Sequence, residues 1–165
     1  MTGLRTNVAD LLHRPGSRRA LQLHAPVPGL AVTASAIPDD EPVVLDVLLE
    51  RVHEGVLVRG AVRAHWAAPC SRCLRPVGGE LDCEMQELFE PTPLDGETYP
   101  LEHDHIDLAL PVRDAVLVEL PLAPLCGPDC AGLCPVCGRD RNDDPCSCDE
   151  KTSDPRWAAL SQLEL

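Results

Sequence analysis

The sequence contains very few aromatic side chains and no long apolar run. Phe89, Tyr99, Trp66 and Trp157 are the complete aromatic set, which leaves few ring surfaces on which single-stranded bases could stack. No stretch approaches the roughly 20 apolar residues that span a membrane, and the N-terminal residues lack the apolar core of a signal peptide. We therefore expect a cytoplasmic protein that does not insert into a membrane.

Sequence motifs of common catalytic sites are also missing. The chain has no H-E-x-x-H motif, no glycine-rich phosphate loop, and no Ser, His and Asp in the pattern of a hydrolase. We therefore expect a protein that is not an enzyme and has no small-molecule substrate.

Positive charge is scarce in the C-terminal half. Residues 76–165 hold five Lys and Arg against twenty Asp and Glu, whereas residues 1–75 hold nine Arg against seven acidic residues. An acidic half repels phosphate backbones and suits a basic partner. Any direct RNA contact is therefore expected in the first half, where the candidates are Arg14, Arg18, Arg19, Arg59 and Arg63.

The alternative interpretation of these arginines is a solvated or ion-paired surface. Arg59 and Arg63 lie on the polar face of a predicted strand. If this strand pairs with the segment 80–90, its carboxylates would lie opposite the two guanidinium groups and neutralise them. Both interpretations stay open at the level of the sequence.

Alternation of apolar and polar residues predicts a sheet. Strands are expected over 20–27, 30–37, 43–53, 56–67 and 80–90. The last three should form an antiparallel meander with one buried face, because Glu54-Gly55 is short enough for a tight hairpin. The predicted class is α+β, with an antiparallel, partly closed sheet, a few short helices and a C-terminal zinc knot.

Helix signals are few. Asn7 and Asp107 can cap helices over 8–13 and 107–119, and Asp154-Pro155 begins an expected amphipathic tail helix. We expect a β-rich core domain over 1–124, which includes the second helix, and a zinc-binding module over 125–165 that carries the tail helix.

Six of the nine cysteines lie between Cys126 and Cys148. The strongest signal is Cys134-Pro135-Val136-Cys137-Gly138, because two thiolates separated by two residues can bind one ion from a single tight turn. Zinc takes four ligands in a tetrahedron, so a second pair is needed. Four thiolates leave no open position on the metal, which makes the site structural rather than catalytic.

Three ligand sets are compatible with six thiols. One zinc ion could be held by Cys134, Cys137, Cys146 and Cys148, which is the favoured set. Cys126 and Cys130 could instead complete the site with the central pair, or two ions could share all six sulfurs. An iron–sulfur cluster is also open to four thiolates.

Cys70-Ser71-Arg72-Cys73 forms a second Cys-x-x-Cys between two strands. The favoured interpretation is a turn with two thiols, and a second metal site with ligands from elsewhere is the alternative. Redox use is disfavoured, because such pairs usually lie at a helix N-terminus that lowers the thiol pKa. Cys83 lies in an apolar alternation and is expected to be a buried free thiol.

Six short segments follow one another in a recognisable order. They are CSRCL at 70–74, Glu87-Leu88-Phe89, VELPLAPLC at 118–126, DCAGLCPVCGRD at 129–140, CSC at 146–148 and DPRWAAL at 154–160. Together they resemble the YceD family of large-ribosomal-RNA accumulation proteins, in its cysteine-rich bacterial form. One departure is the segment Arg139-Asp140-Arg141-Asn142, which is more charged than in the family.

The resemblance implies a non-enzymatic cytoplasmic factor that is needed for large-subunit ribosomal RNA to accumulate. The expected partner is a ribosomal protein or a ribosomal precursor. Two alternatives remain: a general protein-interaction module of the zinc-ribbon type, and a thiol redox protein that uses Cys70 and Cys73.

Overall fold

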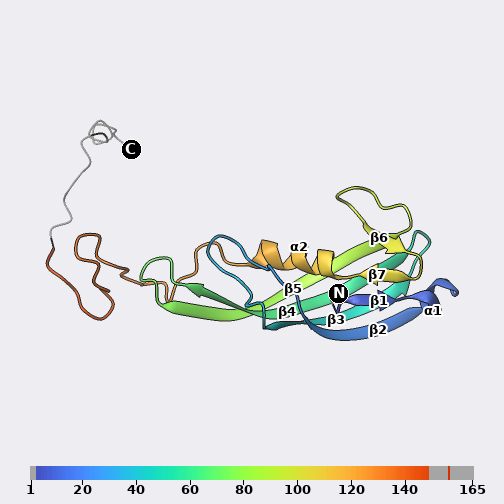
Figure 1. The fold of residues 1–165 in the computed structure, drawn as a ribbon, viewed down its shortest axis with the longest axis horizontal. Coiled ribbons are helices and arrows are strands. Elements are labelled where there is room, and N and C mark those ends of the chain that lie inside the picture. The colour runs from blue at the N-terminus through green and yellow to red at the C-terminus, as the bar shows by residue number, and fades with distance from the viewer. Residues whose placement is uncertain (1–2, 149–155, 157–165) are drawn as a thin grey trace.

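The computed structural model describes residues 3–148 and Arg156 (Figure 1). The predicted tail helix that begins at Asp154 lies outside the described residues. In chain order the elements are β1 (Arg5–Asn7), α1 (Ala9–Leu12), β2 (Arg18–Pro26), β3 (Pro42–Arg51), β4 (Val56–Pro69), β5 (Pro76–Glu90), β6 (Tyr99–Glu102), β7 (His105–Asp107) and α2 (Ala109–Glu119).

The strands form one curled sheet in the order β1-β7-β6-β5-β4-β3-β2. The predicted meander is confirmed: β3, β4 and β5 are consecutive antiparallel neighbours, and β2 extends them. The prediction of a sheet that is antiparallel throughout is wrong, because β6 pairs parallel with β5. The polar loop between Glu90 and Tyr99 carries the chain back, so that β6 enters the sheet in the same direction as β5.

The predicted strand over 30–37 is also wrong. This segment makes only isolated bridges, Ala31 to Ala36 and Ala36 to Ala67. Its alanines give a weak alternation, and the chain instead folds over the buried face, where Leu30 and Ile37 are buried.

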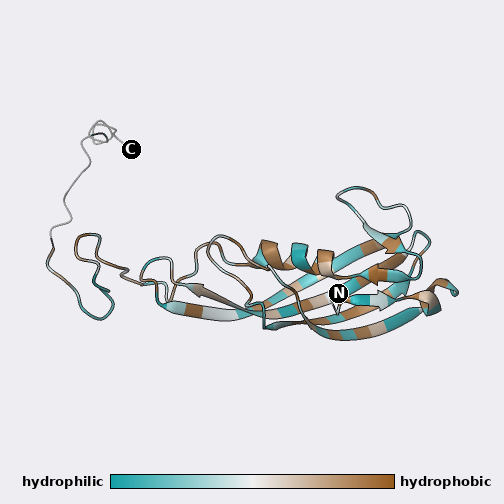
Figure 2. Cartoon of the chain, viewed as in Figure 1, coloured by the Kyte–Doolittle hydropathy of each residue, from teal (hydrophilic) through white to brown (hydrophobic). Residues whose placement is uncertain are grey.

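One face of the sheet carries the hydrophobic core. Hydrophobic and hydrophilic residues alternate along the long strands (Figure 2), and Leu45, Leu49, Val58, Val62 and Phe89 have no exposed surface. Helix α2 packs on this face over β4 and β5 and buries Val112 and Val116. The buried face predicted for β5 is confirmed.

The predicted helices occur close to their expected positions. The side chain of Asn7 accepts the backbone N–H of Ala9 at 2.9 Å, and Asp107 accepts that of Ala109 at 2.9 Å. Asn7 and Asp107 are not the helix caps, however: they lie one residue before the N-caps Val8 and Leu108, which have no side-chain cap, and form turns that lead into the helices. No helix in the described part of the chain is long and apolar enough to span a membrane.

The side chain of Arg19 bridges the two edge strands of the sheet, β1 and β2. Arg19 of β2 donates to the carbonyl oxygen of Asn7 in β1 at 2.7 Å and pairs with Asp10 of α1 at 2.7 Å. The sheet is therefore partly closed by an arginine rather than by a backbone ladder.

The hairpin of β4 and β5 is longer than the other strands and leads away from the sheet (Figure 1). Its tip, Cys70 to Arg75, lies against the cysteine-rich segment, at the opposite end of the molecule from α1. After α2 the chain returns along the molecule to this tip, where Ser71 donates its N–H to the carbonyl oxygen of Pro124 at 2.8 Å.

Candidate metal centres

Four cysteines from two distant segments meet at the hairpin tip. The sulfur atoms of Cys70, Cys73, Cys126 and Cys130 all lie within 4.8 Å of one another. Cys70 and Cys130 are 3.8 Å apart, and Cys73 and Cys126 are 3.6 Å apart. Three of the four are buried, and only Cys126 is exposed. We call this group the tip cluster.

A second group of four lies within one short segment. The sulfur atoms of Cys134, Cys137, Cys146 and Cys148 also lie within 4.8 Å of one another. Cys134 is buried, Cys137 is exposed, and the other two are half-buried. We call this group the local cluster, and it is the ligand set that the sequence favours.

The spacing of the sulfurs fits one tetrahedral ion in each cluster. Four sulfurs at about 2.3 Å from a zinc ion lie about 3.8 Å from one another, close to the separations of 3.8 and 3.6 Å in the tip cluster. A disulfide would need about 2.05 Å. A cluster of several irons ties its thiolates to different metal atoms and spreads them further, so the spacing favours a single ion in each group.

Both Cys-x-x-Cys turns have the same backbone hydrogen bonds. The N–H of Cys70 donates to the carbonyl oxygen of Arg75 at 2.7 Å, and Leu74 donates to Cys70 at 2.9 Å. In the other turn, Cys134 donates to Arg139 at 2.8 Å and Gly138 to Cys134 at 2.9 Å. Each turn therefore presents its two sulfurs on the same side of one rigid loop.

Each of these turns needs one residue with a left-handed backbone. Gly138 has φ 73° in the local cluster, and Leu74 has φ 62° in the tip cluster. Glycine adopts this conformation without strain, whereas a leucine is disfavoured there. The leucine therefore stays left-handed because the surrounding contacts hold it so.

Backbone N–H groups favour the thiolate form at the first cysteine of each turn. The N–H of Cys73 is the main cause that lowers the pKa of Cys70 to about 6, against opposing burial. The N–H of Cys137 does the same for Cys134, whose pKa is lowered to about 5. Such donors also orient a sulfur toward a bound ion.

Other thiols in each group hold their protons more tightly. The pKa of Cys126 is raised to about 12 because its thiol donates to Cys130, and the pKa of Cys148 is raised to about 12 because its thiol donates to Cys137. Without an ion each cluster therefore mixes thiols with thiolates. A bound cation would hold four thiolates together and release the remaining protons.

The two clusters are connected by polar side chains. Asn142 accepts the N–H of Ala131 at 2.9 Å and donates to the sulfur of Cys130 at 3.5 Å. Arg75 of the hairpin donates to Asp140 at 2.7 Å and also pairs with Asp143. Asp140, in the charged segment that departs from the family pattern, thus contacts the hairpin tip through Arg75.

The ninth cysteine lies apart from both clusters. Cys83 is 3% exposed within the core of the sheet, and burial is the main cause that raises its pKa to about 11. This agrees with the free buried thiol that the apolar alternation predicts.

The candidate RNA-contacting arginines are mostly tied to acidic residues. Arg18 and Arg59 both pair with Glu50, at 2.7 and 3.4 Å, and Arg63 pairs with Asp46 at 2.8 Å. The ion-paired interpretation expected partners from 80–90, and Asp82 does lie opposite Arg63. The partners are instead Asp46 and Glu50 of β3, which lie diagonally across from Arg63 and Arg59. Arg14 is exposed just after α1.

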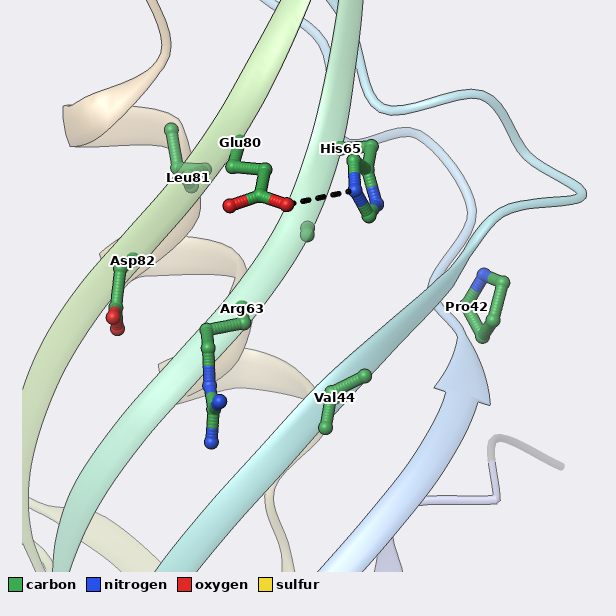
Figure 3. A pocket seen from close by; sticks show the side chains of 8 residues that line it. Pro42, Val44, Arg63, His65, Glu80, Leu81 and Asp82 are labelled. Carbon is green, nitrogen blue, oxygen red and sulfur yellow. Dashed lines mark ion pairs between the residues drawn. The ribbon is translucent and has the colours of Figure 1, made fainter.

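A depression of about 220 Å³ lies on the outer face of the sheet beside Arg63, His65, Glu80 and Asp82 (Figure 3), and a second, more open one lies beside Asp46, Arg59 and Glu84. His65 and Glu80 lie 3.4 Å apart and point toward each other. Its polar side chains come from two neighbouring strands, Arg63 and His65 from β4 and Glu80 and Asp82 from β5.

The sequence did not predict that Cys126 and Cys130 share a site with Cys70 and Cys73. It held the first pair as alternative ligands for the local cluster and the second pair as a turn with two thiols. The number of cysteines could have indicated this grouping. Apart from Cys83 in the predicted strand over 80–90, eight cysteines remain, which is enough for two complete sets of four ligands. Which pair joins which depends on where the hairpin ends in space.

Comparisons with known proteins find relatives over nearly the whole chain. The chain is similar to an uncharacterized protein of Mycobacterium tuberculosis (strain ATCC 25618 / H37Rv), with 38% identity over 166 residues that cover 95% of this chain and 79% of the relative. An uncharacterized protein of Mycobacterium leprae (strain TN) is 34% identical over 166 residues, with 95% and 76% covered. No solved structure matches.

A plant relative has a descriptive name. The large ribosomal RNA subunit accumulation protein YCED homolog 1, chloroplastic, of Arabidopsis thaliana is 24% identical over 170 residues, which cover 82% of this chain and 53% of the relative. The model of the family described as large ribosomal RNA subunit accumulation protein YceD matches residues 58–164, a span that contains both cysteine clusters. The chain therefore belongs to the YceD family.

Proposed function

We propose that this protein is a non-enzymatic cytoplasmic factor that supports the accumulation of large-subunit ribosomal RNA. The family match over residues 58–164 is the observation that carries the proposal. The closed ligand sets agree with it, because four cysteines around one ion leave no coordination position for a substrate.

The local cluster is proposed to hold one structural zinc ion. Its four sulfurs lie within 4.8 Å of one another, and zinc is the ion that most often occupies tetrahedral sets of four thiolates in structural sites. In this role the ion replaces a hydrophobic core, which a segment so rich in Asp, Gly and Pro does not supply.

The proposed partner is a basic ribosomal protein or a ribosomal precursor that contains one. Glu80, Asp82 and Glu84 project from the exposed face of β5, and such a surface attracts cations and repels phosphate. Direct contact with RNA has less support, because Arg18, Arg59 and Arg63 already pair with carboxylates.

The alternative of a thiol redox protein has less support. Cys70 and Cys73 lie at a hairpin tip, not at a helix N-terminus, and two further cysteines surround them. A dithiol that cycles needs an accessible sulfur, whereas both of these cysteines are buried.

The test is a depletion experiment. Cells without the protein should contain less large-subunit ribosomal RNA relative to small-subunit ribosomal RNA, and the wild-type chain should restore the ratio. Cys83→Ala should restore it as well, whereas the double variant Cys146→Ser/Cys148→Ser should not. An unchanged ratio in depleted cells would contradict the proposal.

Purification of the tagged protein from growing cells tests the partner. Ribosomal proteins of the large subunit should co-purify, and they should remain after nuclease treatment if a protein surface is recognised. Their loss with nuclease would show that RNA is the direct partner, and their absence in both samples would contradict a ribosomal role.

A further inference from the structure

We propose that the tip cluster binds a zinc ion of its own, separate from the ion of the local cluster, and that this ion fastens the segment after α2 to the β4–β5 hairpin. The chain would then carry two structural ions. This inference is independent of the ribosomal role, since it concerns metal content and folding.

The first support is the geometry of the tip cluster. Two of its sulfur separations, 3.8 Å between Cys70 and Cys130 and 3.6 Å between Cys73 and Cys126, match a tetrahedral set around one ion. The four sulfurs of each cluster lie within 4.8 Å of one another, and no cysteine belongs to both groups. Two separate ions with four ligands each therefore fit better than two ions that share bridging sulfurs.

The second support is the set of donors around the sulfurs. The backbone N–H of Cys126 points at the sulfur of Cys70 at 3.4 Å, and the amide of Asn142 points at that of Cys130 at 3.5 Å. Hydrogen bonds to ligand sulfurs offset the negative charge of four thiolates around a divalent ion. The local cluster has a similar hydrogen bond, because the backbone N–H of Val136 donates to the sulfur of Cys134 at 3.4 Å.

The third support is that few apolar contacts hold these segments together, although hydrogen bonds and the ion pairs of Arg75 join them. Among the hydrophobic side chains in the described part of the chain, Val77 and Leu133 alone pack against the buried tip cysteines, and Leu122 and Leu125 of the connecting chain are 74% and 37% exposed. Apolar burial here is too small to order a segment of this length, whereas ion binding adds free energy to folding directly.

The ion would fasten the segment after α2 to the β4–β5 hairpin because its ligands come from distant parts of the chain. Cys70 and Cys130 are 60 residues apart, and Cys73 and Cys126 are 53 residues apart. An ion between them closes a large loop that includes β5, β6, β7 and α2. The local cluster closes only the short loop from Cys134 to Cys148.

The test begins with the wild-type full-length chain purified without added metal. Elemental analysis should give two zinc ions per chain, and titration of the metal-free chain with Co²⁺ should raise the thiolate-to-cobalt absorption up to two equivalents. One ion per chain would overturn the inference. Iron with acid-labile sulfide in place of zinc would overturn the identity of the ion.

Paired variants assign the ions. Cys126→Ser/Cys130→Ser and Cys146→Ser/Cys148→Ser should each lower the count from two to one, and Cys83→Ala should keep two. A tip variant that still binds two ions would contradict the assignment.

Hydrogen exchange tests the fastening. In the tip variant the amides of Ser71 and Leu133, which donate to Pro124 and Arg72 across the two segments, should lose protection. Amides between β3 and β4, far from the tip, should lose much less protection than these two, at most the fall in global stability. Retained protection of Ser71 and Leu133 would show that the ion does not fasten the segment.

Discussion

The two Cys-x-x-Cys turns have the same backbone, but their partner cysteines lie at very different distances along the chain. Both close with the same pair of hydrogen bonds. The turn at Cys134 finds its partners within the same short segment, at Cys146 and Cys148, whereas the turn at Cys70 finds them 53 and 60 residues away. The same local motif therefore serves a small loop in one region and the tertiary fold in the other.

The largest expected effect is on the free energy of unfolding, and it should differ between the two turns. Cys73→Ser should lower the free energy of unfolding of the sheet by at least about 3 kcal/mol, because it removes a ligand of the ion that closes the long loop. Cys148→Ser should change it by less than about 0.5 kcal/mol, because its cluster is local. Denaturant unfolding followed by circular dichroism measures both.

The control for this pair is Ser71→Ala, an exposed change in the same turn, which should leave the unfolding midpoint unchanged. Equal losses in the two cysteine variants would mean that the clusters act as one unit, and the contrast between them would be lost.

The second prediction exchanges the left-handed residues. Leu74→Gly should raise the free energy of unfolding by about 1 kcal/mol, because it relieves the strain of a leucine at φ 62°, and the side chain is 63% exposed, so little burial is lost. Gly138→Ala should weaken the local cluster by about 1 kcal/mol. Thermal unfolding and resistance to a chelator measure these changes.

Leu74→Ala is the matched control, because alanine keeps the strain of the left-handed backbone and should give no gain. A loss of stability in Leu74→Gly would show that the leucine side chain itself contributes to the tip.

The third prediction concerns the link between the clusters. Arg75→Ala should lower the free energy of unfolding by about 0.5–1 kcal/mol, a modest value because the arginine is 39% exposed. The loss should shrink at high salt. Arg139→Ala, which removes an exposed pair with Asp144 within the local segment, should have almost no effect. Unfolding at two salt concentrations distinguishes the two variants.

The smallest expected effect contrasts the pH response of the core with that of the clusters. Burial, and then the charge of Asp114, raises the pKa of Glu87. A carboxyl whose pKa is raised on folding stabilises the fold below its unfolded pKa and loses that contribution as pH rises through the folded pKa. The clusters respond in the opposite direction, because protons compete with the ion for sulfur as pH falls.

Glu87→Gln should therefore be slightly more stable than the wild type at neutral pH, and the difference should vanish in acid. A pH series of unfolding midpoints measures it, with Glu84→Gln on the exposed face of the same strand as the control. A difference that grows in acid would contradict the raised pKa.

Much of the sheet was predictable because its pattern is local. The strands expected over 43–53, 56–67 and 80–90 correspond to β3, β4 and β5, whose alternation is long enough to read. β1, β6 and β7 were missed, since strands of three or four residues show no period. The parallel pairing of β6 could not be predicted, because loop length alone does not fix strand direction.

The local cluster was predictable for the same reason, and the tip cluster was not. Cys134, Cys137, Cys146 and Cys148 lie in one short segment, where spacing alone suggests a common ion. The partners of Cys70 and Cys73 depend on where a long hairpin places its tip and on how far the chain returns after α2.

The sequence by itself determined the alternation that builds the sheet, the two tight cysteine turns and the acidity of the C-terminal half. The tertiary structure alone decided which thiols share a site, which carboxylates neutralise the arginines of β4, and how β6 joins the sheet. The physical reason is range: hydrogen bonds within a turn and the periodicity of a strand act between neighbours in the chain. Contacts between segments arise only when the whole fold brings them together.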